Sequence, residues 1–181
     1  MSFKYILCFG TLNPDLIYFV DELPTKGGDI RSLKSSMRPG GTAINCSELI
    51  SLWKKSVQVR GNSIGNDPMG KYLVDYLKEN NINFDGLIIN QSLTPTCSIF
   101  VDSSGERTIV SSGYEGLEWS NFENLNNFDS LIIDRYSIRF IKDKLKDLKK
   151  QNSLFVCQAG YEYEIDYLSL IHISEPTRRL I

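Results

Sequence analysis

Apolar and polar positions alternate with two different periods along this chain. Continuous apolar runs, typical of buried strands, occur at residues 4–10, 87–89, 131–133 and 154–157. Apolar positions at helical spacing predict helices at 43–55, after 67–68, and at about 138–148. Residues 56–64 alternate like one more strand. Because strands and helices alternate, we expect an α/β fold with a doubly wound, mainly parallel sheet.

Two pairs of extended segments do not fit this rhythm. One pair lies at about residues 16–38, and the other is a hairpin at about 95–112, with Ser103-Ser104-Gly105 at its turn. We expect the two pairs to form a small, separate antiparallel sheet beside the main one.

Composition limits the classes of function. The 181 residues suffice for one domain with a sizeable core, and 41% of them are hydrophobic and 23% charged. A formal net charge of −2 gives no basic field, so we expect neither nucleic acid nor a membrane as a partner. No apolar run approaches the roughly 18 residues of a membrane-spanning helix.

The four cysteines are Cys8, Cys46, Cys97 and Cys157, and none lies within metal-ligand spacing of another. Their apolar or small-residue surroundings predict buried free thiols, which fit a reducing compartment. The N-terminal segment lacks a signal-peptide cleavage pattern. We therefore predict a cytoplasmic protein.

Polar side chains follow the first predicted strand in Asn13-Pro14-Asp15. In open α/β sheets, ligands bind at the carboxyl ends of the strands. An ionised Asp accepts hydroxyl hydrogen bonds, and Asn both donates and accepts, so the pair suits a ligand with many hydroxyl groups. A simple Asx-type turn at Asn13-Pro14 is the alternative interpretation.

Two glycines, Gly40 and Gly41, precede a predicted helix that carries Asn45 in its first turn. Glycine lets the backbone approach a ligand closely, and a helix N-terminus presents free amide groups. We expect Asn45 to face the same crevice as Asn13 and Asp15, although a glycine turn before an ordinary helix also explains the pattern. The first strand is followed by neither Gly-x-Gly-x-x-Gly nor a P-loop.

Several motifs in order resemble the PfkB, or ribokinase-like, family of carbohydrate kinases. They are Gly10-x-x-Asn13-x-Asp15, Leu23-Pro24 followed by a glycine pair, Gly40-Gly41-x-x-x-Asn45, Gly61-Asn62-Ser63-Ile64-Gly65-x-Asp67-x-x-Gly70, and Gly105-Glu106-Arg107-Thr108. The resemblance implies a ribokinase-like fold in which the extra strands form a β lid over the sugar site. The lid in this family often also pairs two subunits, so a homodimer is a further expectation.

The resemblance also implies roles for individual residues. Asn13, Asp15, Gly41 and Asn45 would hold sugar hydroxyl groups. Gly40, beside Gly41, and Asp134, at the end of a predicted strand, would lie near the substrate. Gly65, Asp67 and Gly70 match positions that connect a strand to a helix, and we expect them to be structural.

The resemblance implies a reaction too, in which ATP with Mg²⁺ gives its γ-phosphoryl group to a sugar hydroxyl. The family's catalytic base lies in an Asp-Thr-x-Gly-Ala-Gly-Asp stretch, which this sequence does not contain. We therefore interpret residues 1–167 as the N-terminal part of a ribokinase-like domain and assign no catalytic residue. An intact parent would be a sugar kinase, and we predict that this chain is inactive.

The last residues, 168–181, resemble a translated sequencing adapter, and we predict a non-native tail there. The single histidine, His172, lies in this segment. Which sugar or nucleoside is bound does not follow from the sequence.

Three other classes of function stay open. A non-catalytic sugar- or nucleoside-binding module would use the same pocket without any downstream catalytic motif. A nucleotide- or flavin-binding Rossmann-like domain would need phosphate-binding glycines after the first strand, where Gly10-Thr11-Leu12-Asn13 stands instead. A purely structural protein would not need this set of Asn, Asp and Gly residues.

Overall fold

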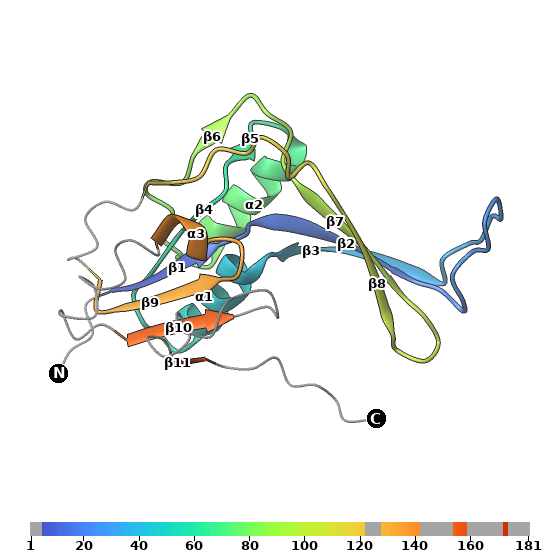
Figure 1. Ribbon diagram of the computed structural model, residues 1–181, viewed down its shortest axis with the longest axis horizontal. Coiled ribbons are helices and arrows are strands. Elements are labelled where there is room, and N and C mark those ends of the chain that lie inside the picture. The colour runs from blue at the N-terminus through green and yellow to red at the C-terminus, as the bar shows by residue number, and fades with distance from the viewer. Residues whose placement is uncertain (1–4, 122–127, 142–153, 159–171, 174–181) are drawn as a thin grey trace.

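The computed structural model describes residues 5–121, 128–141, 154–158 and 172–173. Its main sheet has five parallel strands in the order β11-β10-β9-β1-β4 (Figure 1). The strands are β1 (Ile6–Gly10), β4 (Val57–Gly61), β9 (Ser130–Asp134), β10 (Leu154–Gln158) and β11 (His172–Ile173). The doubly wound parallel sheet expected from the sequence is confirmed. The β11 strand lies in the segment interpreted as a non-native tail, and that interpretation stays a prediction.

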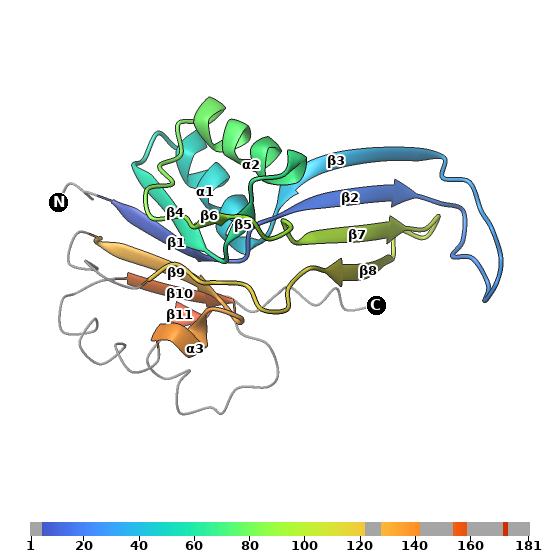
Figure 2. The same ribbon diagram turned by 90° about the horizontal axis from the view of Figure 1, so that it is seen from above.

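In the described part of the chain, three helices flank this sheet. They are α1 (Thr42–Leu52), α2 (Pro68–Glu79) and the short α3 (Ile138–Ile141). Figure 2 shows α1 and α2 on one side of the main sheet and α3 on the other. The first helix ends at Leu52, three residues before the predicted end at position 55. Lys54 has a φ of 55°, which lies outside the right-handed helical region, so the helix cannot continue through it. The second half of the helix expected at 138–148 lies outside the described residues.

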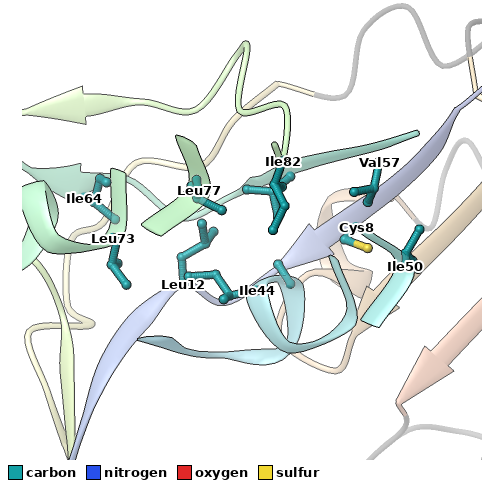
Figure 3. Packing of buried hydrophobic residues seen from close by; sticks show 11 residues of the cluster. Cys8, Leu12, Ile44, Ile50, Val57, Ile64, Leu73, Leu77 and Ile82 are labelled. Carbon is teal, nitrogen blue, oxygen red and sulfur yellow. The ribbon is translucent and has the colours of Figure 1, made fainter. Parts of the chain in front are cut away.

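The core fills the space between the sheet and the two long helices (Figure 3). Its buried residues come from β1, the β1–β2 link, α1, β4, β5, α2 and the segment after α2; they are Cys8, Leu12, Ala43, Ile44, Ile50, Val57, Val59, Ile64, Leu73, Leu77 and Ile82. Burying each large aliphatic side chain contributes about 1.5–3 kcal/mol, so this cluster fixes α1 and α2 on the sheet. Cys8 is buried as expected, whereas Cys46 and Cys97 are only half-buried.

A second sheet projects away from the main one and is called the lid here (Figures 1 and 2). Its strands, in the order β3-β2-β7-β8, are β2 (Asn13–Phe19), β3 (Lys34–Gly40), β7 (Thr96–Val101) and β8 (Arg107–Ser112). The expectation of an antiparallel lid is wrong at its centre, where β2 and β7 are parallel. The lid consists of two antiparallel pairs, β2 with β3 and β7 with β8. The first strands of the two pairs, β2 and β7, run in the same direction and lie next to each other, so the contact between the pairs is parallel.

Two predicted strands near the sheet edge differ from the structure. The strand expected at 56–64 is divided into β4 and a two-residue β5 (Ile64–Gly65), because Asn62 turns its side chain to the backbone of Leu12. The apolar run 87–89 does not join the main sheet. Asn83 already bonds the outer edge of β4, and only β6 (Ile89–Asn90) forms, paired with β5.

Among the described residues, no helix is long and apolar enough to cross a membrane.

The start of α2 is held by one carboxylate. The side chain of Asp67 accepts hydrogen bonds from the Gly70 amide and from both the amide and the hydroxyl of Thr94, each at 2.8 Å. Partial burial would raise the pKa of Asp67, but these hydrogen bonds outweigh it and lower the pKa. The structural role expected for this residue fits this geometry.

We expect Asp67→Ala to lower the free energy of unfolding by about 1–3 kcal/mol, because it removes the helix cap and leaves the amide and the hydroxyl hydrogen of the buried Thr94 without their acceptor. Denaturant unfolding measures the change. The matched control is Asp75→Ala on the same helix, whose exposed ion pair with Lys78 is worth about 0.5 kcal/mol or less. An equal cost for both variants would contradict this account.

The stability that Asp67 contributes also depends on pH. Since the folded-state pKa of Asp67 is lowered, this contribution is present above the unfolded-state pKa and disappears as the pH falls through the folded-state value.

Candidate functional site

The candidate site lies where β1 ends and the chain crosses into the lid. The link between β1 and β2 is Thr11-Leu12, and both residues are buried. Asn62, fully buried at the end of β4, accepts a hydrogen bond from the Leu12 amide at 2.8 Å and donates one to its carbonyl at 3.0 Å. The link is therefore fixed from the neighbouring strand before it delivers Asn13 and Asp15.

Thr11 joins three elements around this link. Its amide and hydroxyl donate to Oδ2 of Asp134 at 2.7 and 3.0 Å, which ties the end of β9 to the link. Its hydroxyl and carbonyl also accept the amides of Thr42 and Ala43 at the start of α1, at 3.3 and 3.2 Å. The expectation of free amides at this helix start is therefore wrong for Thr42 and Ala43, because Thr11 caps α1 from another element.

Asp134, expected near the substrate, is only 1% exposed. Its second oxygen, Oδ1, accepts the amides of Tyr136 and Ser137 at 3.0 and 2.9 Å, so both oxygens are bonded inside the protein. The carboxylate stabilises the β1–β2 link through Thr11. Its proximity to a substrate stays a prediction.

The backbone at Gly40 and Gly41 comes very close to this link. Gly41 has φ 85° and ψ 150°, a conformation that is essentially restricted to glycine. A Cβ there would lie 2.2 Å from the Thr11 carbonyl oxygen. A Cβ at Gly40 would lie 2.2 Å from Oδ2 of Asp15, so the carboxyl group of Asp15 rests directly on Gly40. The two glycines therefore make room for the backbone and for this carboxylate.

Asn13 and Asp15 are not in a turn as the alternative interpretation required. Both lie in β2, paired with Gly40 and Arg38 of β3. Asn13 is 2% exposed, and its Nδ2 donates to Oδ1 of Asp15 at 2.6 Å. Among the described residues, Oδ2 of Asp15 has no hydrogen-bond partner. Asp15 is half-buried, and burial raises its pKa, with a smaller opposing effect of the Asn13 hydrogen bond.

The structure brings Asp15 together with Gly40 and Gly41, and Asn13 lies behind Asp15. Asn45 lies in the first turn of α1, where its amide bonds the Gly41 carbonyl at 3.0 Å and its side chain is exposed. That these residues hold sugar hydroxyls stays a prediction.

Tyr114 is a neighbour of this site that the sequence interpretation missed. Its hydroxyl donates to Oδ1 of Asn13 at 2.8 Å, across 101 positions of sequence. The one sequence feature that could have drawn attention to Tyr114 is its position directly after Gly113. This glycine follows the second lid hairpin and has a φ of 78°. A lone tyrosine after a turn does not by itself indicate a contact with a motif so far away.

Comparison with known protein families shows which family this chain belongs to. Residues 4–157 match the family described as pfkB family carbohydrate kinase. The chain belongs to this family. The match includes β1, both halves of the lid, α1, α2 and the described part of β10 up to Cys157.

Individual relatives agree with this family. The chain is 30% identical to ketohexokinase of Mus musculus over 112 residues, which are 61% of this chain and 37% of that protein. Ribokinase of Thermotoga maritima has a similar structure, with a TM-score of 0.74 at 18% identity, over 93% of this chain and 57% of that one. Ribokinase of Arabidopsis thaliana, solved with ribose and ATP, gives a TM-score of 0.69 at 18% identity, over 88% and 54%. The chain thus spans between a third and three fifths of these relatives, and its fold is ribokinase-like.

Proposed function

We propose that this chain carries the sugar-binding part of an ATP-dependent carbohydrate kinase. The observation that carries the proposal is the Asp15 carboxylate, held on Gly40 where β2 and β3 of the lid meet the main sheet, with one oxygen left unbonded by the described residues. Because the chain belongs to the carbohydrate kinase family, a hydroxyl group of the sugar is the partner that we propose for this free carboxylate oxygen.

Each residue of the site contributes a different interaction. Ionised Asp15 accepts hydrogen bonds from one or two hydroxyl groups of the sugar. Gly41 lets the start of α1 lie against the Thr11 carbonyl, which keeps Gly40 and Asp15 in place, and Asn45 offers a side-chain amide that both donates and accepts. Asn13, which is buried behind Asp15, supports this carboxylate through its hydrogen bond to Oδ1.

The phosphoryl donor is a separate question. The relatives include a ribokinase solved with ATP, and ATP with Mg²⁺ is the donor that we propose for the intact enzyme. In the described part of this chain, however, no group of three or more His, Cys, Asp or Glu side chains is arranged to bind a metal ion. These residues therefore do not account for Mg²⁺ binding, and we derive no step of phosphoryl transfer from them.

Calorimetric titration of the purified chain with D-fructose and with D-ribose tests the proposal, with ADP release from ATP and Mg²⁺ followed in parallel. We expect saturable binding of one of the sugars and no ADP release, because the sequence lacks the family's catalytic stretch. Turnover would contradict the predicted inactivity, and the absence of binding to either sugar at millimolar concentration would contradict the proposed sugar site.

We also propose that two copies of the chain pair through their lids. Ile17, Ile99 and Ile109 lie opposite one another on β2, β7 and β8, which puts an apolar row on one face of the lid. Ile109 is 52% exposed on the edge strand β8. An exposed apolar row of this kind favours a contact with a second copy.

Ile109→Asp is expected to convert a concentration-dependent dimer into a monomer in sedimentation velocity, because it buries a charge in the proposed interface. Leu93→Asp is the matched control, since Leu93 is 77% exposed and lies outside the lid strands. A wild-type chain that stays monomeric at every concentration would rule out the lid contact.

A further inference from the structure

Tyr114 connects the segment that follows the β7–β8 hairpin with the candidate sugar site. It follows β8 through Gly113, and its side chain is half-buried against β2 and β7. Its hydroxyl donates to Oδ1 of Asn13 at 2.8 Å and lies 3.6 Å from the sulfur of Cys97. Cys97 is the residue of β7 directly opposite Asp15, so Tyr114 reaches the part of the lid that borders the carboxylate.

The partners of Asn13 fix which way its side-chain amide faces. The Pro14 carbonyl and the Asp15 carboxylate can only accept, so the NH₂ group is directed to them at 3.2 and 2.6 Å, and the amide oxygen receives the Tyr114 hydroxyl. All the polar groups of this 2% exposed side chain are then engaged. A flipped amide would place its oxygen against the Asp15 carboxylate, an unfavourable contact between two acceptors.

Tyr114 keeps its proton over the whole working range of pH. Burial raises the pKa of its phenol first of all, and the hydrogen bond with Cys97 and the nearby charges of Cys97, Asp15 and Tyr136 raise it further. The hydroxyl therefore remains available as a donor to the Asn13 amide oxygen near neutral pH.

We propose that Tyr114 is a positioning residue of the sugar site, which acts through Asn13 to hold the Asp15 carboxylate in the orientation that receives the substrate hydroxyl. This inference rests on the proposed sugar-binding function and adds to it a residue outside the family-like motifs. Tyr114 needs no contact with the sugar, because its effect reaches the sugar through two consecutive hydrogen bonds.

The test is Tyr114→Phe, which removes one oxygen and keeps the ring. Binding of D-fructose and D-ribose is measured by calorimetry, and the side-chain amide of Asn13 is followed by nitrogen-15 NMR. We expect about a 10-fold weaker sugar affinity, roughly the worth of one hydrogen bond, because Asn13 no longer holds the Asp15 carboxylate in a single orientation. We also expect faster exchange of the Asn13 amide protons with water, which a role in packing alone would not produce.

Tyr18→Phe is the matched control, since Tyr18 stacks on Phe100 of the same lid and its hydroxyl has no hydrogen-bond partner among the described residues. It should leave both readouts unchanged. Wild-type affinity in Tyr114→Phe, with the wild-type chain binding sugar, would overturn the role of Tyr114 and leave the sugar site intact. No sugar binding by the wild-type chain would overturn the proposed function and this inference with it.

A wild-type measurement covers the case in which Tyr114→Phe fails to fold. Titration of the wild-type chain with the bound sugar should shift the Asn13 side-chain amide and the ring signals of Tyr114 together. A sugar-dependent shift at Asp15 without any change at Asn13 and Tyr114 would overturn the proposal.

Discussion

Asp15→Asn is expected to weaken the binding of D-fructose or D-ribose by about 100-fold or more, because a hydrogen bond to a charged acceptor is worth about 1.5–3 kcal/mol and the proposed carboxylate accepts more than one. The backbone should be unchanged, since the new side chain has the same shape and its oxygen can still accept from Asn13. Calorimetry on the variant gives the loss of affinity directly.

The same substitution is expected to raise the thermal unfolding midpoint at pH 7. Burial raises the folded-state pKa of Asp15 above the ordinary value of an aspartate, so keeping this group ionised in the folded chain costs stability. Stability of the wild-type chain should therefore increase as the pH falls through that raised value, and the advantage of Asp15→Asn should shrink there. A site residue that lowers stability is common where binding requires a buried charge.

Asp29→Asn is the control for both measurements. Asp29 lies exposed in the connection between β2 and β3, so it loses the same charge without touching the site. Weaker sugar binding by Asp29→Asn of the same size would show that net charge, and not the Asp15 contact, determines affinity. An Asp15→Asn variant that binds sugar like wild type would remove Asp15 from the site.

Gly41→Ala is expected to have the largest effect on stability, a loss of about 3–5 kcal/mol, since it combines a strained backbone with a steric clash. The backbone at Gly41 is in a region that other residues avoid, and the added methyl carbon would lie 2.2 Å from the Thr11 carbonyl. That carbonyl cannot easily move, because it accepts the Ala43 amide and its residue is held by Asp134. Denaturant unfolding measures the loss.

Gly105→Ala separates the two causes. Gly105 also has a positive φ, 82°, but a Cβ there would meet nothing within 4 Å. Only backbone strain applies, and we expect a loss of about 1–2 kcal/mol. If Gly41→Ala cost no more than Gly105→Ala, the close approach between Gly41 and Thr11 would not contribute to stability.

Local patterns in the sequence predicted the parts of the fold that depend on local physics. The apolar runs at 4–10, 131–133 and 154–157 became β1, β9 and β10, because a strand buried on both faces needs a continuous apolar run. The helix beginning near Asp67 followed from its cap and Pro68. The motif resemblance gave the family, which the match over residues 4–157 confirms.

Contacts between distant segments could not be predicted in the same way. Thr11 bonds Asp134 across 123 positions and Tyr114 bonds Asn13 across 101, and nothing in either local sequence indicates the partner. The parallel pairing of β2 with β7 likewise depends on where two separate hairpins leave the main sheet. These long-range contacts hold Asn13, Asp15 and the two glycines in one place, which is the part of the site that only the structure reveals.

The central claim is that the sugar binds on the Asp15 carboxylate beside Gly40 and Gly41, and backbone amide NMR of the labelled chain tests it most directly. Titration with the sugar that calorimetry selects, D-fructose or D-ribose, should shift the amide signals of Asp15, Gly40, Gly41 and Asn45 along one saturable curve, and Asp15→Asn should abolish the shifts. Saturable shifts confined to other parts of the chain, or shifts that survive in Asp15→Asn, would contradict the claim.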